Sequence, residues 1–166
     1  MTSPRETLRR ILVAKAYELF ADYGVACEEV GSVVDAAREL CGILGFTSKH
    51  LSGAVMVCAT PDAIASSNPI ADGATRSWVA ELTNQLVGRF KNELLGNGLE
   101  LVMTIPIVLT ANQVMPLHQL ASPPARLAVG SGFLTLWLEV EIDPDLVLVE
   151  PNTELTITPA GHALMS

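Results

Sequence analysis

Positive charge is scarce in this sequence. Lys and Arg together number 10 against 18 Asp and Glu residues, and the formal net charge is −8. A protein that binds the phosphate backbone of nucleic acids needs clustered Lys and Arg. The second half of the sequence holds only Arg89, Lys91 and Arg126. We therefore expect no nucleic-acid partner, whereas a basic patch on a protein partner would be compatible with this acidic chain.

Cysteines and long apolar runs are also few. The three cysteines, Cys27, Cys41 and Cys58, form no C-x-x-C pair. They indicate buried, reduced thiols of a cytoplasmic protein rather than a zinc site. No stretch approaches the ~20 continuous apolar residues of a membrane span. The opening MTSPRETLRR has neither the apolar core nor the cleavage pattern of a secretory signal, so we expect a cytoplasmic protein that does not enter a membrane.

The sequence opens with a well-marked helix. Ser3 is a capping residue, Pro4 suits the first helical position, and Glu6 completes a Ser-x-x-Glu capping box. Apolar residues then recur on one face, and Gly24 predicts the end of the helix near Tyr23. That face consists of Leu8, Ile11, Leu12, Ala16, Tyr17 and Leu19. The segment predicts a helix that packs on a sheet.

The segment from residue 25 to residue 72 divides into three parts with different predicted secondary structure. Residues 25–38 fit either a strand or a helical turn. LCGILGF and AVMVCA then predict the two arms of a hairpin around the polar turn SKHLSG, with Gly45 and Gly53 beside the turn. Residues 60–72 contain Pro61 and Pro69, which predicts mostly loop with one helical turn.

The next segment predicts a second long helix and a strand. The helix is expected from about Asp72 to Leu95, because Gly96-Asn97-Gly98 is a strong stop signal. The strand is expected at 99–105. Pro106 predicts that this strand ends there or lies at a sheet edge.

A second hairpin is predicted around Gly130-Ser131-Gly132, with arms at 126–129 and 133–142. In the second arm, apolar residues alternate with polar ones, so one face of the sheet is buried and the other is wet. This pattern favours an α+β domain in which two principal helices pack on an antiparallel β-sheet.

The second long helix has two unlike faces at ~100° per residue. Its core face consists of Val79, Leu82, Leu86, Phe90 and Leu94, and its opposite face carries Ser77, Glu81, Asn84, Gln85, Gly88, Lys91 and Asn92. Glu81 and Asn84 are three residues apart, so their side chains project together. Gly88 costs ~1 kcal/mol of helix stability relative to alanine, which suggests a partner that approaches closely.

Two interpretations of this polar face stay open on the residues alone. Polar residues on an exposed helix face are usually only solvated. They would also suit the hydrolysis of an acylphosphate, in which a helper orients water for in-line attack without supplying its own nucleophile. An amide such as that of Asn84 can orient water, and a carboxylate such as that of Glu81 can bind a lysine of the partner.

The helix and its surroundings resemble the CheC, CheX and FliY phosphatase family over roughly residues 40–142. The family's helix carries Glu-x-x-Asn, followed at fixed spacing by glycine, lysine and leucine. The matching residues, in order and spacing, are Glu81, Asn84, Gly88, Lys91 and Leu94. The next strand of the family ends in a proline, as at Pro106. Upstream, GFTSKHLSGAVMV is similar to the family's GFxG…SGxV element.

The resemblance implies a CheC/CheX-like fold and one domain. We expect a single CheX-like domain over 1–150, in which 1–38 form a leading helix and connection and 39–150 are the best-matched part. Residues 151–166 are expected to form a C-terminal tail with one strand-like run at 154–158.

The resemblance also implies a function. It is that of a phosphatase that stimulates hydrolysis of the aspartyl phosphate of a CheY-like response regulator in chemotaxis or two-component signalling. Asn84 would orient the water and Glu81 would pair with the regulator's lysine, so these two are the expected catalytic residues. The residues on the same face that we expect to bind the partner are Ser77, Gln85, Gly88 and Lys91. The reacting aspartate and Mg²⁺ belong to the regulator, so no cofactor of the chain's own is expected, and family members suggest a homodimer.

The sequence departs from the family pattern at two places. Ala80 stands where the family has glycine before the glutamate, and Ala111-Asn112 stand where glycine often follows the proline. A single Glu-x-x-Asn motif favours the CheX-like branch over CheC, which has two. The alternative is a non-catalytic adaptor that binds a receiver domain, or assembles in a signalling or motor complex, without hydrolysis.

Other conspicuous residues favour ordinary structural roles. His50, His118 and His162 lie far apart in turn or loop contexts, which predicts neither a metal site nor a catalytic one. Gly130-Ser131-Gly132 is typical of a hairpin turn rather than a nucleophile elbow. Trp137 falls on the wet face of its strand and is a candidate subunit contact.

Overall fold

The computed structural model describes residues 3–31, 39–69, 75–111 and 123–148. In chain order its elements are α1 (Pro4–Asp22), β1 (Cys27–Val30), β2 (Glu39–Thr47), β3 (Leu51–Ala59), α2 (Pro61–Ser67), α3 (Thr75–Leu95), β4 (Val102–Met103), β5 (Ile107–Ala111), β6 (Ala125–Val129) and β7 (Gly132–Ile142). The strands form one 7-stranded antiparallel sheet in the order β1-β6-β7-β3-β2-β4, and β5 also pairs with β2. The predicted α+β class, with two principal helices on an antiparallel sheet, is confirmed.

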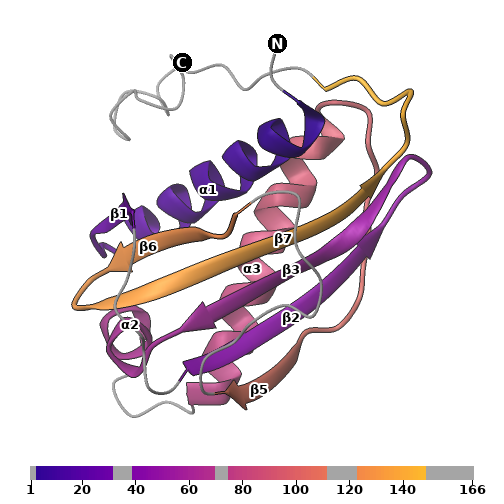
Figure 1. The fold of residues 1–166 in the computed structure, drawn as a ribbon. Helices are drawn as coiled ribbons and strands as arrows, with labels where there is room; N and C mark the ends of the chain where they lie inside the picture. The colour runs from indigo at the N-terminus through magenta and orange to yellow at the C-terminus, as the bar shows by residue number, and fades with distance from the viewer. Residues whose placement is uncertain (1–2, 32–38, 70–74, 112–122, 149–166) are drawn as a thin grey trace.

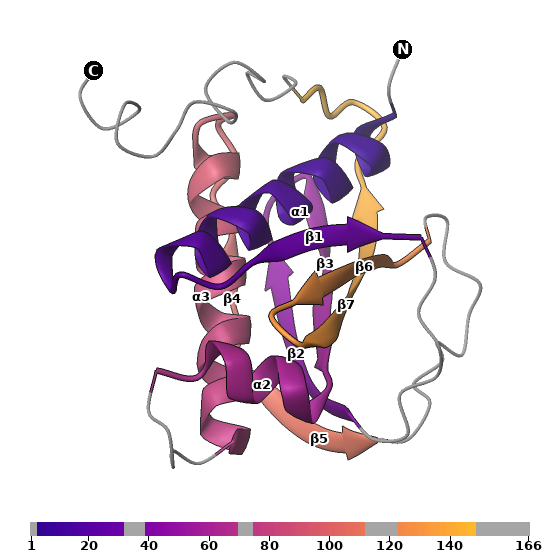
Figure 2. The same cartoon turned by 90° about the vertical axis from the view of Figure 1, so that its left-hand side faces the viewer.

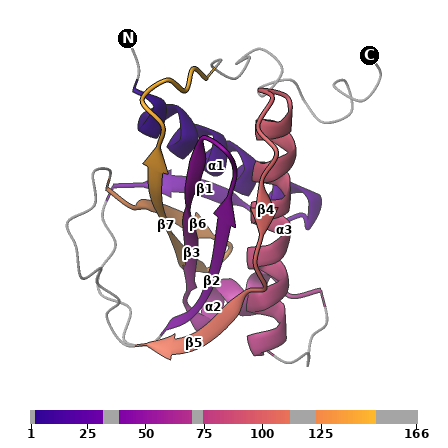
Figure 3. The same cartoon turned by 90° about the vertical axis from the view of Figure 1, so that its right-hand side faces the viewer.

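The two long helices pack on the same face of the sheet (Figure 1). α3 lies against β2 and β3, whereas α1 lies against β1, β6 and β7 and also contacts α3 (Figure 2). The other face of the sheet, which is turned to the viewer in Figure 1, is covered by none of the described helices, and Figure 3 shows α3 to one side of β2 and β3. The helices therefore enclose one core layer, and α3 keeps a long side turned away from it.

The leading helix begins and ends as its sequence predicts. The Ser3 hydroxyl accepts a hydrogen bond from the backbone N–H of Glu6 at 3.2 Å, and Pro4 occupies the first turn. Tyr23 is the C-cap, and Gly24 follows it with φ of +68°, a conformation that glycine adopts without steric cost. The apolar face of α1 is buried in the core.

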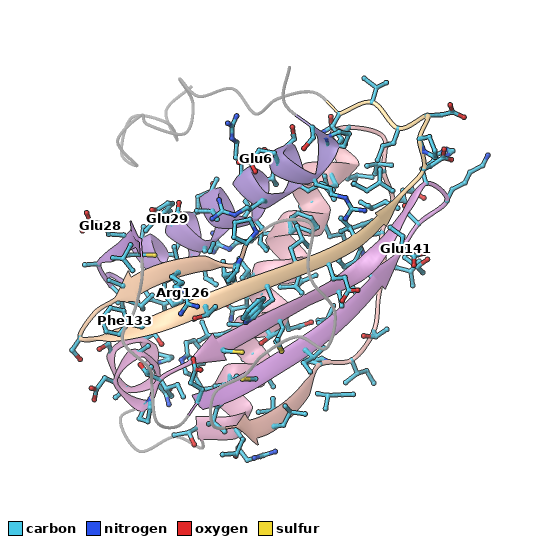
Figure 4. The ribbon with its side chains drawn as sticks, in the orientation of Figure 1. Glu6, Glu28, Glu29, Arg126, Phe133 and Glu141 are labelled. Atoms are coloured by element: carbon cyan, nitrogen blue, oxygen red, sulfur yellow. The ribbon has the colours of Figure 1, made fainter. Side chains whose placement is uncertain are left out.

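Both predicted hairpins are present. β2 and β3 pair from Leu40 opposite Ala59 to Thr47 opposite Ser52. β6 and β7 meet at the predicted turn, where Gly130 has φ of +56°. In β7 the alternation holds, since Leu134, Leu136 and Val140 are buried while Glu139 and Glu141 are exposed. Figure 4 shows Arg126, Phe133 and Glu141 on the sheet face away from α3.

A short helix replaces most of the loop predicted at 60–72. α2 runs over Pro61–Ser67, and the Thr60 hydroxyl accepts a hydrogen bond from the Ala63 N–H at 3.3 Å. Thr60-Pro61 thus repeats the capping pattern that Ser3-Pro4 provides for α1. The prediction of one helical turn understated this element, because the prolines and serines around it are more typical of loops.

One sheet edge is made of two short strands in line. Residues 104–106, between β4 and β5, lie opposite only Leu44 and Gly45 of β2. The edge therefore has a one-residue bulge, and a bulge at a sheet edge is a position that tolerates proline, which has no backbone N–H to donate. The prediction of a strand at 99–105 was right about the edge and wrong about its extent, since only Val102–Met103 pair there and β5 follows the proline.

Two earlier expectations fall partly or wholly outside the described residues. The ambiguity at 25–38 resolves into a strand for Cys27–Val30, and 32–38 are not described. The strand-like run at 154–158 is also outside, as are the whole predicted tail at 151–166 and the junction at residue 150. Among the described helices, none is long and apolar enough to span a bilayer.

Candidate functional site on helix α3

The predicted division of α3 into two faces is confirmed. The core face, Val79, Leu82, Leu86, Phe90 and Leu94, is at most 2% exposed. On the other side, Ser77, Glu81 and Asn84 are exposed. Gln85, Gly88 and Lys91 are partly exposed. The functional roles of these six residues stay predictions.

Five of the six residues follow one straight line along the helix, called the polar stripe here: Ser77, Glu81, Asn84, Gly88 and Lys91. Their spacing alternates between four and three residues, and such a series stays on one side of an α-helix. At 1.5 Å per residue the polar stripe is about 21 Å long. A rigid partner surface of that length can contact all five residues together.

Close packing fixes the height of α3 above the sheet. Thr83 lies one position before Asn84 and is fully buried, and its hydroxyl donates to the Val79 carbonyl at 2.7 Å. Beneath it stands Gly42 of β2, where an added Cβ would lie 2.0 Å from the Thr83 Oγ1. The glycine therefore permits the helix to approach the strand, and the polar stripe rests on a closely packed base.

Two arginines of α3 contact neighbouring elements. Near its start, Arg76 donates to the Val108 carbonyl of β5 at 2.6 Å. Farther along, Arg89 forms an ion pair with Asp22 of α1 at 2.5 Å. These contacts restrict rotation of α3 about its axis. The polar stripe therefore stays on the solvent side of the helix.

The Asn84 side chain has no hydrogen-bond partner among the described residues. Its amide offers two donors and an acceptor, and the residue is exposed. Gly88, one turn beyond, is open in the same sense, since a Cβ added there would meet nothing within 4 Å. The centre of the polar stripe is therefore an unobstructed surface with an amide that can bind water.

Glu81, in contrast, is already engaged. Its Oε1 accepts a hydrogen bond from the Gln85 Nε2 at 2.8 Å. The Oε1 of Gln85 accepts one from the Tyr23 hydroxyl at 2.9 Å. Sequence reasoning did not assign any role to Tyr23 beyond the helix end, because no local signal reports a contact between residues 62 positions apart.

The cysteines offer no nucleophile beside the polar stripe. Cys41 and Cys58 face each other across β2 and β3, and both are buried. Two effects raise the pKa of Cys58 above its usual range: its hydrogen bond with Cys41, which is the larger, and its burial. Burial raises the pKa of Cys27 to about 12. Thiols held protonated in this way suit packing rather than nucleophilic catalysis.

The histidines do not form a site with the polar stripe either. The Nδ1 of His50 lies 2.9 Å from the Asp143 Oδ2, at the turn end of β2 and β3. His118 and His162 lie outside the described residues. Within the described ranges, no group of three or more His, Cys, Asp or Glu residues is placed to hold a metal ion. Trp137 is half-buried on the outer sheet face, and its predicted subunit contact is untested.

Neither protein-family models nor the sequences of curated proteins match this chain. Solved structures do. The chemotaxis protein CheX from Vibrio vulnificus superposes with a TM-score of 0.65 at 14% identity, covering 84% of this chain and 100% of that one. A CheC-like superfamily protein from Shewanella sp. PV-4 gives 0.62 at 17% identity, covering 81% and 97%. The fold is that of the CheC, CheX and FliY proteins.

Two further solved structures share this fold. A CheX–CheY–BeF₃–Mg²⁺ complex from Borrelia burgdorferi gives a TM-score of 0.55 at 14% identity, covering 80% of this chain and 96% of that one. FliY from Thermotoga maritima gives 0.53 at 14% identity, covering 88% and 93%. The CheC/CheX-like fold predicted from the Glu-x-x-Asn helix is thereby confirmed, and identities this low speak for the fold alone.

Proposed function

We propose that this protein is a CheX-like phosphatase that stimulates hydrolysis of the aspartyl phosphate of a CheY-like response regulator. The observation that carries the proposal is the exposure of Glu81 and Asn84 together on α3, in a chain with the CheC/CheX/FliY fold. A CheX of this fold is known in a complex with CheY. The acidic surface and the open polar stripe suit a protein partner.

The reaction needs little from the helper besides position. A water oxygen attacks phosphorus in line with the bond to the aspartyl oxygen; that bond breaks, the aspartate leaves as a carboxylate, and the water's protons pass to phosphate or solvent. The amide of Asn84 would hold the water on that line. Mg²⁺ bound by the regulator would neutralise the phosphoryl oxygens, and Glu81 would bind the regulator's lysine.

The test is a single-turnover series against receiver domains of the same organism, phosphorylated with acetyl phosphate in the presence of Mg²⁺. We expect Asn84→Ala to lower the maximal dephosphorylation rate by about 10²-fold, on the scale of one lost transition-state hydrogen bond, and to leave receiver affinity almost unchanged. Both properties follow if Asn84 acts mainly in the transition state. The side chain is exposed, so the variant should fold normally.

Glu81→Ala serves as the contrasting variant in the same series. Loss of a charge-assisted bond to a partner lysine should weaken docking by roughly 1.5–3 kcal/mol. Full activity of Asn84→Ala would refute the mechanism. A protein that binds receivers without shortening the lifetime of their phosphoryl group would be the adaptor instead.

A further inference from the structure

We infer that Tyr23 and Gln85 are positioning residues, which fix the carboxylate of Glu81 in the orientation that a receiver meets. The inference rests on the proposed function, because it concerns the group assigned to docking. Its basis is the hydrogen-bonded chain, here called the relay, that runs from the Tyr23 hydroxyl through the Gln85 amide to the Glu81 Oε1, with lengths of 2.9 and 2.8 Å.

The chemistry of the relay sets its direction. The carboxylate of Glu81 only accepts hydrogen bonds, so the Gln85 group beside it must be the NH₂. Turning the amide over would place its oxygen against the carboxylate. The Gln85 oxygen therefore faces Tyr23, and the Tyr23 hydroxyl must donate to it. Each bond polarises the next, which strengthens the relay as a unit.

The relay begins at a firmly held residue. Tyr23 is the C-cap of α1, and its ring meets the ring of Trp78 edge-on, with centroids 5.2 Å apart. Trp78 is buried and donates from Nε1 to the Ser67 hydroxyl at 3.0 Å. Ser67 in turn donates to the Ala63 carbonyl of α2 at 2.8 Å. Contacts with α1 and α2 thus hold Tyr23 in place, and through Gln85 they restrict the carboxylate of Glu81.

The relay differs from an ordinary pair on a helix surface. Gln85 follows Glu81 by four residues, and such pairs alone stabilise helices weakly. Here the half-buried Gln85 is also held from another helix. Both ends of its amide are engaged within the chain, although its predicted contact with a partner stays untested. Asn84 lacks a comparable support among the described residues, as suits a group that must bind a water.

The relay matters because a glutamate side chain has three rotatable bonds. A receiver that meets a freely rotating carboxylate must immobilise it, and immobilising such a side chain weakens binding by about two- to tenfold. A carboxylate that is already fixed avoids this loss. The relay is therefore expected to act on receiver affinity rather than on the rate of the chemical step.

Two variants of the full-length protein remove the relay with little change of shape. Tyr23→Phe deletes the hydroxyl and keeps the ring against Trp78, and Gln85→Met keeps the length of the side chain without its amide. Binding is measured by calorimetry with a CheY-type receiver in Mg²⁺ and beryllium fluoride, so that no hydrolysis is needed. Each variant should bind about two- to tenfold more weakly, and the maximal dephosphorylation rate of Tyr23→Phe should stay within about twofold of wild type.

A matched control is Tyr17→Phe. Tyr17 also lies on α1, and its hydroxyl accepts a hydrogen bond from the Glu29 N–H at 2.7 Å, away from α3. This control loses the same atom and should bind the receiver as wild type does. A double-mutant cycle then separates positioning from mere stability: in a Glu81→Ala background, Tyr23→Phe should have no further effect on affinity.

The fixing of Glu81 is also read directly, by three-bond NMR couplings that report its side-chain rotamers. Wild type and Tyr17→Phe should show one dominant rotamer, and Tyr23→Phe and Gln85→Met should show averaging. Unchanged couplings, or an affinity loss that persists without Glu81, would overturn the relay even if Asn84→Ala behaves as proposed. Conversely, the protein could fail to speed hydrolysis while the variants show the expected affinity losses and NMR couplings. That result would refute the phosphatase function and support the relay. A protein that binds no receiver would overturn both.

Discussion

The two faces of α3 differ in how much space surrounds them. On the core side the five apolar residues are almost fully buried, and a methyl group added at Gly42 would lie 2.0 Å from the Thr83 Oγ1. On the polar side, a methyl group added at Gly88 would meet nothing within 4 Å. The core face therefore determines where the helix sits, and the polar face is open for a partner. Mutations on the two faces should differ in kind.

The largest effect on stability is expected at Phe90. Its ring is fully buried and contacts Phe46 edge-on, with centroids 5.7 Å apart. Phe90→Ala should lower the free energy of unfolding by about 3–5 kcal/mol, because it removes a fully buried ring and leaves a cavity in the core. Lys91→Ala, one residue on, should change it by less than about 0.5 kcal/mol. Urea unfolding measures both, and similar losses would contradict the division into faces.

Gly42→Ala should have the next largest effect on stability. The new methyl group would force Thr83 and β2 apart, and such overpacking costs about 1–3 kcal/mol. Adding Thr83→Ala removes the Oγ1 that lies nearest and should restore part of the loss. Strict additivity of the two substitutions in urea unfolding would show that the contact does not limit the approach of α3.

Gly88 should respond in the opposite direction. Gly88→Ala should raise the free energy of unfolding by about 0.5–1 kcal/mol, because glycine is a poor helix residue and the site has room. Gly88→Leu should also fold, and its larger side chain should exclude the receiver. Stability comes from urea unfolding and binding from calorimetry; a leucine variant that binds as wild type does would show that the partner does not approach this face.

The smallest effect is expected at Asp143, which follows β7. A hydrogen bond from the Asp145 N–H, and then one from His50, lowers the pKa of Asp143. A carboxyl of this kind adds stability that is complete above its unfolded pKa, about 3.9, and is lost as the pH falls through the lower folded value. The advantage of wild type over Asp143→Asn should therefore shrink below about pH 4. Urea unfolding across that range checks it, and a constant difference would contradict it.

Local signals in the sequence predicted much of this fold. Ser3, Pro4 and Gly24 marked α1 because caps and left-handed glycines act within one turn of the chain. The hairpins were recognisable from alternation and from Gly130. β5 was missed because Pro106 indicates a strand end. The bulge between β4 and β5, after which pairing with β2 resumes, depends on register with a strand distant in the sequence. The length of α2 was underestimated because so short a helix cannot show a repeated spacing of apolar residues.

The candidate site divides in the same way. Glu81, Asn84 and Gly88 were found because they share a helix face, which the 3.6-residue period reveals. Their exposure followed from the apolar residues opposite. Tyr23 was not found, since its bond to Gln85 requires that α1 and α3 be placed side by side. Contacts between elements far apart in the chain leave no periodic trace in a single sequence.

The contact between Trp78 and Tyr23 also makes the protein its own optical reporter. The chain has 2 tryptophans, and the other, Trp137, lies on the outer face of the sheet. Trp137→Phe would leave Trp78 as the single tryptophan, buried one turn before Glu81 and in edge-on contact with the Tyr23 ring. Stopped-flow fluorescence of that variant would then follow the arrival of a partner in real time, without any dye attached to either protein.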